Sequence, residues 1–140
     1  MTQHVRDVMT ARPVTVEPVA SVASVARVMR DENIGAVLVA EQERLRGLVS
    51  DRDLVVRVLA EGGDPERTTV GDACSGDLVT VGPDDELRQA VAAMREHAVR
   101  RVPVVDGERN VVGVVSLADL AIERDPDSAL GDISAAKPNR

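Results

Sequence analysis

Two parts of this 140-residue chain carry nearly the same sequence. The run VTVEP at 14–18 returns as VTVGP at 79–83, 65 residues later, and GLVSDRDL at 47–54 returns as GVVSLADL at 113–120, 66 residues later. The chain is therefore a tandem duplication with one residue inserted late in the second copy. A repeat of about 65 residues is too long for a solenoid and short for an independent core, so we expect the copies to pack face to face about a pseudo-two-fold axis. Any functional site should then exist in two versions.

The first copy predicts the element order β-α-β-β-α. A short strand at 14–16 precedes a helix at 19–32, in which Val22, Ala26 and Met29 recur at helical steps. Two β-rich runs separated by a polar turn predict a hairpin, and paired apolar residues predict a second helix that ends at a Gly-Gly pair. These later elements are expected at 35–40, 45–50 and 51–61.

The second copy repeats this order. Leu87, Val91 and Met94 form the apolar stripe of its first helix. The three acids at 84–86 are expected in the first turn of that helix, where the helix dipole favours negative charge. The other elements are expected at 79–81, 102–105, 111–116 and 117–124.

The duplication also divides the chain. It predicts an α/β (α+β) fold of two tandem β-α-β-β-α repeats, the first at 5–62 and the second at 70–124, joined by a polar, turn-rich linker at 63–69. Residues 125–140 lack a sustained apolar period, so we expect much of this C-terminal tail to be mobile.

Composition argues against several classes of protein. The chain contains no Phe, Tyr or Trp, so its core must be aliphatic and no ring is available to stack on bases. The net charge of −7 at pH 7 opposes binding to a phosphate backbone, and we expect no nucleic-acid partner. No apolar run is long enough to span a membrane and no signal-peptide pattern is present, so a cytoplasmic protein without membrane contact is expected.

Residues that bind metals or form disulfides are scarce. Cys74 is the only cysteine, which rules out a disulfide within one chain. With only His4 and His97 beside it, a His/Cys metal site is poorly supported, and no metal is expected.

The most informative pattern is Ser-x-x-Asp, which occurs as Ser50 with Asp53 and as Ser116 with Asp119. Each pair stands where an apolar strand turns into a helix, and amides at a helix start are unsatisfied and can bind phosphate. The Ser hydroxyl can donate to a phosphate, and the Asp can accept from a ribose diol. The same spacing is that of a capping box, which would stabilise each helix by roughly 1 kcal/mol without any ligand. On spacing alone the capping box is the favoured interpretation.

These elements resemble a known family. The tandem β-α-β-β-α repeats, the stretch HAVRRVPVVDGERNVVGVVSLADL at 97–120 and the paired Ser-x-x-Asp motifs resemble the CBS domain pair, or Bateman module, over about residues 5–124. The stretch SDRDLVVRVLAEGGDP further resembles small stand-alone bacterial members, including actinobacterial stress- and hypoxia-response proteins. The resemblance implies a regulatory module, commonly a homodimer, that binds AMP, ADP, ATP, S-adenosylmethionine or another adenosine derivative in clefts between the repeats. It favours a functional role for the Ser-x-x-Asp pairs and implies no required cofactor.

The resemblance also implies roles for individual residues. Asp53 and Asp119 match the ribose-binding aspartates, and Ser50 and Ser116 match the small hydroxyl residue beside the phosphate. Residues that match the adenine side of the cleft, or offer aliphatic contact there, are Thr15, Val16, Ile34, Thr80, Val81 and Val102.

A basic pair distinguishes the two copies. Arg100 and Arg101 match residues that can reach phosphates, although such arginines can equally be a solvated strand edge. The first copy has Gly35 and Ala36 at the same place, so a phosphate there would lack a guanidinium clamp. We therefore expect two unequal sites.

Several functional hypotheses remain at this point. The leading one is a non-catalytic nucleotide-sensing module, because no phosphate-binding glycine loop or nucleophile elbow is present. A structural dimerisation module without ligand is the main alternative, and redox sensing through Cys74 is a weaker one. A Ser/His/Asp hydrolase built around His97 has no supporting spacing.

Overall fold

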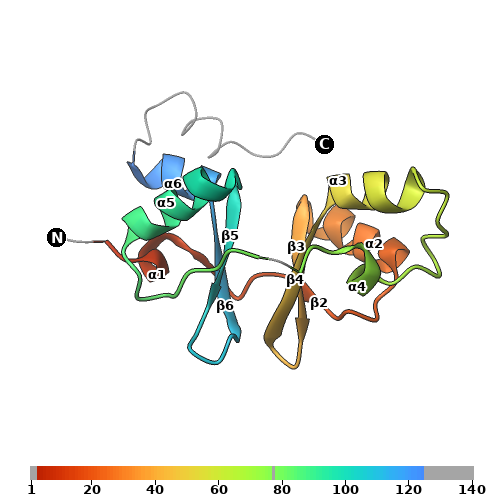
Figure 1. The fold of residues 1–140 in the computed structure, drawn as a ribbon, viewed down its shortest axis with the longest axis horizontal. Coiled ribbons are helices and arrows are strands. Elements are labelled where there is room, and N and C mark those ends of the chain that lie inside the picture. The colour runs from red at the N-terminus through yellow and green to blue at the C-terminus, as the bar shows by residue number, and fades with distance from the viewer. Residues whose placement is uncertain (1–2, 77, 125–140) are drawn as a thin grey trace. The chain divides into compact units, whose positions relative to one another are not determined.

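The computed structural model describes residues 3–76 and 78–124, with side chains described to residue 121. The two hairpins, with a helix before and after each, follow the duplicated order expected from the sequence (Figure 1). The strand expected at 79–81 is a correction, because only an isolated bridge at Val81 is present there. In chain order the elements are α1 (Val5–Val8), β1 (Thr10–Ala11), β2 (Thr15–Val16), α2 (Val22–Glu32), β3 (Ala36–Glu41), β4 (Arg44–Ser50), α3 (Asp51–Asp53), the π-helix η1 (Leu54–Leu59), α4 (Val70–Ala73), α5 (Leu87–His97), β5 (Arg101–Val105), β6 (Val111–Ser116) and α6 (Leu117–Arg124).

The chain forms two compact units. The first-repeat unit is Pro13–Leu78, and the second-repeat unit joins Met1–Arg12 with Val79–Arg140. The second-repeat unit is therefore discontinuous in sequence. The predicted repeats at 5–62 and 70–124 are defined by the duplicated sequence pattern. The compact units are defined by which residues contact each other, so their bounds differ from those of the repeats. The tail at 125–140, expected to be mobile, lies outside the described residues.

The first-repeat unit is built on the sheet β2-β3-β4. β2 runs parallel to β3, and β3 pairs antiparallel with β4 through the predicted hairpin. Val25, Val37 and Val49 lie in its aliphatic core, which also contains Met29 and Val58. The alternating burial along β4 shows why its sequence LRGLVS forms a strand with one face on the core.

The second-repeat unit is built on the sheet β1-β6-β5. β5 and β6 form the second predicted hairpin, and Val81 makes an isolated parallel bridge to Val104, where the first unit has a strand pair. Its core contains Leu87, Val102 and Val115. In both units the absence of aromatic residues is met by close packing of Val, Leu, Ala and Met side chains.

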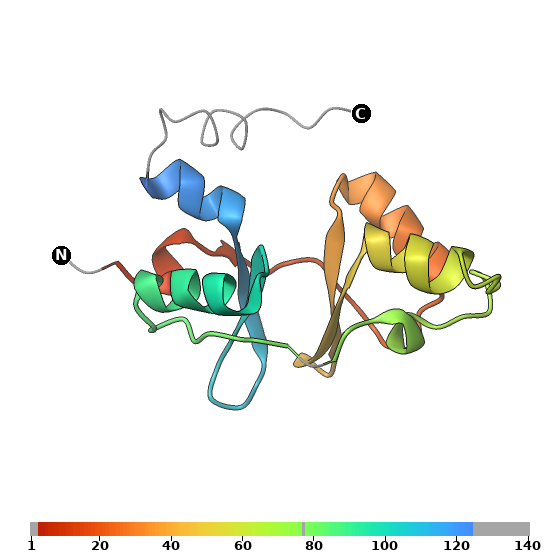
Figure 2. The ribbon, with the colours of Figure 1, turned by 45° about the horizontal axis from the view of Figure 1, so that its top comes forward.

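The first segment of each predicted repeat pairs with the hairpin of the other repeat. β1, at the start of the chain, pairs antiparallel with β6, so that Thr10 faces Val114. The duplicated position, Ser75, makes the same kind of bridge to Leu48 of β4. The short helices α1 and α4 accompany these exchanged segments, and Figure 2 shows α1 beside the elements of the second repeat. Sequence patterning did not predict this exchange.

Two glycines permit the exchange. A Cβ added at Gly47 would lie 2.5 Å from the Cys74 Sγ and 2.8 Å from the Ser75 carbonyl oxygen. A Cβ added at Gly113 would lie 2.6 Å from the Met9 Sδ and 2.9 Å from the Thr10 carbonyl oxygen. The exchanged segments therefore cross the hairpins at positions where no side chain fits.

Three details of the predicted helices are corrected. α2 begins at Val22 and not at 19, because Ser21 caps it by accepting from the Ser24 amide at 3.1 Å. The acids at 84–86 precede α5, whose N-cap is Glu86, and Asp85 instead accepts from the Gly82 amide at 2.8 Å. The second helix of the first repeat is a short α-helix followed by a π-helix, a form that sequence periodicity does not distinguish.

Within the described ranges, every helix is too short or too polar to cross a lipid bilayer.

Candidate ligand-binding site

Both Ser-x-x-Asp motifs form capping boxes. The Ser50 hydroxyl accepts from the Asp53 amide at 3.1 Å, and the Asp53 Oδ2 accepts from the Ser50 amide at 2.8 Å. In the second repeat the Ser116 hydroxyl accepts from the Asp119 amide at 3.1 Å, and the Asp119 Oδ2 accepts from the Ser116 amide at 3.0 Å. The interpretation favoured by spacing alone is therefore confirmed in both copies.

A capping box does not use all the polar groups of these residues. Each Ser hydroxyl serves as an acceptor and keeps its own hydrogen to donate, and each carboxylate keeps its Oδ1. In the first repeat, Oδ1 of Asp53 lies 3.6 Å from Nε of Arg57. No cation among the described side chains pairs with Oδ1 of Asp119. The second-repeat carboxylate therefore keeps more capacity to accept from a ligand.

The amides at the helix start in the first repeat are occupied. The Asp51 amide donates to the Gly35 carbonyl at 2.9 Å, and the Arg52 amide donates to the Asp51 Oδ1 at 2.8 Å. The Asp53 amide is used in the capping box. The expectation of unsatisfied amides at this helix start is therefore wrong for the first repeat.

The second repeat differs at one amide. The Leu117 amide donates to the Arg100 carbonyl at 2.8 Å, and the Asp119 amide is used in the capping box. Between them, the Ala118 amide has no acceptor within the part of the chain that the structure describes. The Ser-x-x-Asp spacing is the same in both copies and does not signal this difference, which depends on the side chain that follows the cap.

The two arginines and the capping box lie at the same end of the β5–β6 hairpin. Arg101 is the cross-strand partner of Ser116, and directly opposed residues have Cβ atoms about 4.5–5.5 Å apart. Arg100 is tied to the start of α6 through its carbonyl. Both arginine side chains are exposed, and neither forms an ion pair with a described residue. The structure thus brings together Arg100, Arg101, Ser116 and Asp119.

The first repeat lacks this positive charge. Ala36 is the cross-strand partner of Ser50. A Cβ added at Gly35 would lie 3.3 Å from the Asp51 Oδ2, so a carboxylate stands against the glycine that replaces Arg100. Leu117 occupies the position of Asp51 in the second repeat. Electrostatics therefore favour an anion at the second repeat.

The residues expected on the adenine side have different degrees of exposure. Thr15 is exposed in β2, and Val16, Ile34 and Thr80 are half-buried. These four side chains remain accessible within their units, whereas the two remaining candidates require correction.

Val81 and Val102 do not offer the expected ligand groups. The Val81 amide donates to the Pro103 carbonyl at 3.1 Å, and its carbonyl accepts from the Val105 amide at 2.9 Å. Its side chain is buried as well. Val102 has no exposed surface and packs in the core, so its predicted side-chain contact with a ligand is wrong. β5 is buried at three consecutive positions, 102–104, and its continuous apolar run VPV could have indicated this.

Cys74 has a packing role in the first-repeat unit. Its Sγ lies 3.5 Å from the Gly71 carbonyl oxygen and stands against Gly47. Desolvation by burial raises the pKa of the Cys74 thiol, so the reactive thiolate is disfavoured. Met9 occupies the duplicated position against Gly113, so a sulfur-containing side chain packs on this glycine in both copies. Nothing in this geometry favours the redox-sensor hypothesis.

The fold and the site together define a class of protein. Its members have two duplicated α/β repeats, each with a polar cluster at the point where the last strand of the hairpin is followed by a helix. Two matches to the CBS domain, at residues 5–60 and 70–124, cover most of the chain. The chain belongs to the CBS domain family.

Relatives of similar length share this organisation. The CBS domain-containing protein YhcV of Bacillus subtilis is 38% identical over 127 residues, which cover 91% of this chain and 89% of that protein. Hypoxic response protein 1 of Mycobacterium tuberculosis is 36% identical over 117 residues, covering 83% of this chain and 81% of that protein.

Solved structures confirm the tandem CBS fold. The structure of Hypoxic Response Protein I with two coordinated zinc ions matches with a TM-score of 0.79 and 34% identity, covering 86% of this chain and 98% of that one. The CBS domain pair of MJ0100, in complex with 5-methylthioadenosine and S-adenosyl-L-methionine, matches with a TM-score of 0.80 and 22% identity, covering 91% of this chain and all of that one. In this chain, residues 3–76 and 78–124 contain no group of three His, Cys, Asp or Glu side chains placed to hold a metal ion.

Proposed function

We propose that this protein is a non-catalytic regulatory module that binds an adenosine-type nucleotide, such as AMP, ADP or ATP, mainly through its second repeat. The observation that carries the proposal is the cluster of Arg101 and Arg100 with Ser116 and Asp119 at one end of the β5–β6 hairpin. The MJ0100 CBS pair, which shares the fold, binds two adenosine derivatives.

Each residue of the cluster has a role suited to its chemistry. Asp119 would accept from the ribose hydroxyls through Oδ1, which the capping box leaves available. Arg100 and Arg101 would pair with phosphate oxygens, assisted by the Ser116 hydroxyl and the Ala118 amide. Thr80 would contact the base, while the first-repeat residues Thr15, Val16, Ile34, Ser50 and Asp53 would form a weaker site.

Signalling would follow from differential binding. A nucleotide that pairs with the cluster stabilises one arrangement of β5, β6 and α6, and any partner that prefers this arrangement then binds more tightly. The nucleotide is not consumed in this scheme. Multiple-turnover phosphate release from ATP and magnesium, lost on replacing Asp119, would contradict the non-catalytic assignment.

The direct test is calorimetric titration of AMP, ADP and ATP into the wild type and two matched variants. Asp119→Ala removes the ribose acceptor and should weaken binding by one to two orders of magnitude, about 1.5–3 kcal/mol for a hydrogen bond to a charged group. Asp53→Ala removes the equivalent group of the first repeat and should leave the tighter site unchanged. Because both variants lose a capping box, each must first be shown to be folded by circular dichroism.

The structural alternative makes a different prediction. A dimerisation module without ligand shows no change in thermal stability with any nucleotide, whereas a ligand at one hundred times its Kd should stabilise the protein by about 2.7 kcal/mol. Equal thermal unfolding with and without millimolar AMP, ADP and ATP would favour the structural module.

A further inference from the structure

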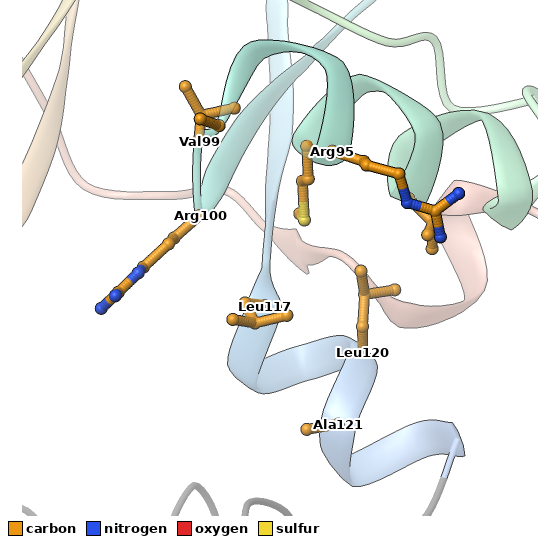
Figure 3. Close-up of a pocket in the computed structure, with 9 residues that line it drawn as sticks. Arg95, Val99, Arg100, Leu117, Leu120 and Ala121 are labelled. Atoms are coloured by element: carbon orange, nitrogen blue, oxygen red, sulfur yellow. The ribbon is translucent and has the colours of Figure 1, made fainter.

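A groove with an aliphatic floor lies between α5 and α6 of the second-repeat unit (Figure 3). Its volume is about 660 Å³. Met94 and Leu120 form part of its floor, and Val99 and Leu117 stand at its margin with 37% and 41% of their surface exposed. Ligands and peptide segments bind in grooves of this size and apolar character.

A guanidinium group lies toward each end of the groove. Arg95 comes from α5 and Arg100 from the segment that follows it, and their side chains extend in opposite directions (Figure 3). Neither forms an ion pair with a carboxylate of the described residues. An occupant that matches the groove would carry apolar side chains in its middle and a negative charge toward each end.

The chain itself contains such a segment directly after α6. Residues 127–133 read DSALGDI, with Asp127 and Asp132 on either side of Ala129 and Leu130, and with Ile133 following. Between residues 125 and 134 the sequence has three aspartates and no lysine or arginine. The charge and the apolar pattern are both complementary to the groove.

Only two residues connect α6 to the segment 127–133, and one of them is a proline. α6 lines the groove and ends at Arg124, and Pro126 opposes continuation of the helix. An eight-residue helix is about 12 Å long, whereas seven extended residues span about 23 Å. The segment is therefore long enough to return along the full length of α6.

We propose that residues 127–133 dock in the groove between α5 and α6 of the same chain, with Leu130 and Ile133 on the aliphatic floor and the two aspartates near Arg95 and Arg100. A short tether gives an effective concentration of about millimolar, so even a weak segment competes with free partners. Because Arg100 also belongs to the nucleotide-binding cluster, docking would place a carboxylate beside that cluster. The inference does not depend on nucleotide binding.

The test is paramagnetic nuclear magnetic resonance on the full chain. A spin label is attached to Ser134→Cys in a Cys74→Ser background, and the methyl signals of Leu117 and Leu120 are compared with those of Val111, at the far end of β6. Docking predicts that the Leu117 and Leu120 signals lose most of their intensity while the Val111 signals keep theirs. Unchanged Leu117 and Leu120 signals would overturn the proposal.

Three further samples test whether the segment itself docks and whether it docks within one chain. Adding Leu130→Asp and Ile133→Asp should restore the groove signals, whereas the matched control, Ala135→Asp with Ala136→Asp, adds the same charge outside the segment and should leave them attenuated. The third sample mixes isotope-labelled chains that carry no spin label with spin-labelled chains that carry no isotope. Any loss of signal in this mixture reports contacts between molecules. Attenuation that arises only in this mixture would assign the groove to a second copy and overturn docking within the chain.

Discussion

Two glycines determine how each hairpin meets the exchanged segment. At Gly47 and Gly113 an added methyl group would come within 2.5 and 2.6 Å of a sulfur atom, and within 3.0 Å of a backbone carbonyl oxygen. The sulfur atoms belong to flexible or short side chains, but the backbone oxygens cannot move without disturbing the strand pairs. The backbone of the exchanged segment, and not the sulfur side chain, is therefore what excludes a larger residue at Gly47 and Gly113.

Gly47→Ala and Gly113→Ala should each destabilise the protein by about 1–3 kcal/mol, the usual cost of forcing an extra methyl group into a packed site. The measurement is chemical denaturation followed by circular dichroism. Gly107→Ala is the matched control, because nothing lies within 4 Å of its added Cβ. If all three variants unfolded at the same denaturant concentration, the close crossing would be refuted.

The Cys74 thiol should make stability depend on pH in the alkaline range. Burial raises its pKa in the folded state, so its contribution is fully present below the unfolded-state pKa of about 8.5 and is lost as pH rises through the folded-state pKa. Cys74→Ser should remove this part of the pH dependence. Thermal unfolding from pH 7 to 10 would test it, and an alkylation rate at pH 7 faster than that of a free thiol would contradict the raised pKa.

Among the helices and strands, α1 and β1 form an exchanged segment that is an integral part of the second-repeat unit. Val5 of α1 has no exposed surface and belongs to the core that contains Leu87 and Val115. The Val5 amide also donates to the Asp85 carbonyl at 2.9 Å. α1 is thus held by both packing and hydrogen bonding.

Val5→Ala should destabilise the protein by about 2 kcal/mol, from two lost methyl groups and the cavity that remains. Amide hydrogen exchange should increase in β5 and β6, which lie about 100 residues away in sequence, more than in β3 and β4. Val19→Ala, at a side chain with 75% of its surface exposed, is the control. Faster exchange confined to the neighbouring first repeat would argue against the exchange of segments.

Sequence patterning predicted the long elements and the short strand β2, and it missed α1, β1 and α4. The hairpins and the apolar stripes of α2 and α5 were predicted because each spans enough residues to show a period. α1, α4 and β1 have two to four residues, and their partners lie in the other repeat, so no local pattern identifies them. The π-helix η1 has the same apolar pairs as an α-helix and differs only in its hydrogen bonds.

The candidate site was predictable in its residues and less so in its chemistry. Duplication and spacing identified the Ser-Asp pairs, and comparison of the copies identified Arg100 and Arg101. The state of each helix-start amide depends on three-dimensional contacts, such as the bond from the Leu117 amide to the Arg100 carbonyl. The burial of Val102 follows from strand orientation, which a family resemblance does not convey.

At the scale of the whole molecule, we predict a homodimer in solution. The outer face of η1 exposes Val55, Val56 and Leu59, with 54%, 44% and 56% of their surfaces accessible, and a second copy could cover this apolar face. Sedimentation velocity should give the mass of a dimer for the wild type and of a monomer for Val55→Asp with Leu59→Asp. Val19→Asp, at a still more exposed valine outside η1, should remain dimeric. A monomeric wild type at all concentrations would refute the prediction.

The exchanged segments also govern the order in which the chain can fold during synthesis. The first-repeat unit, Pro13–Leu78, is continuous in sequence and can complete its contacts as soon as it leaves the ribosome. The second-repeat unit needs α1 and β1, which are made before the first-repeat unit, and β6, which is made after it. β1 must therefore wait, unpaired, until about a hundred further residues have been made, and pairings of such long separation form slowly. A nascent chain stalled before β6 should hold a folded first repeat and an N-terminal segment that proteases can still cut.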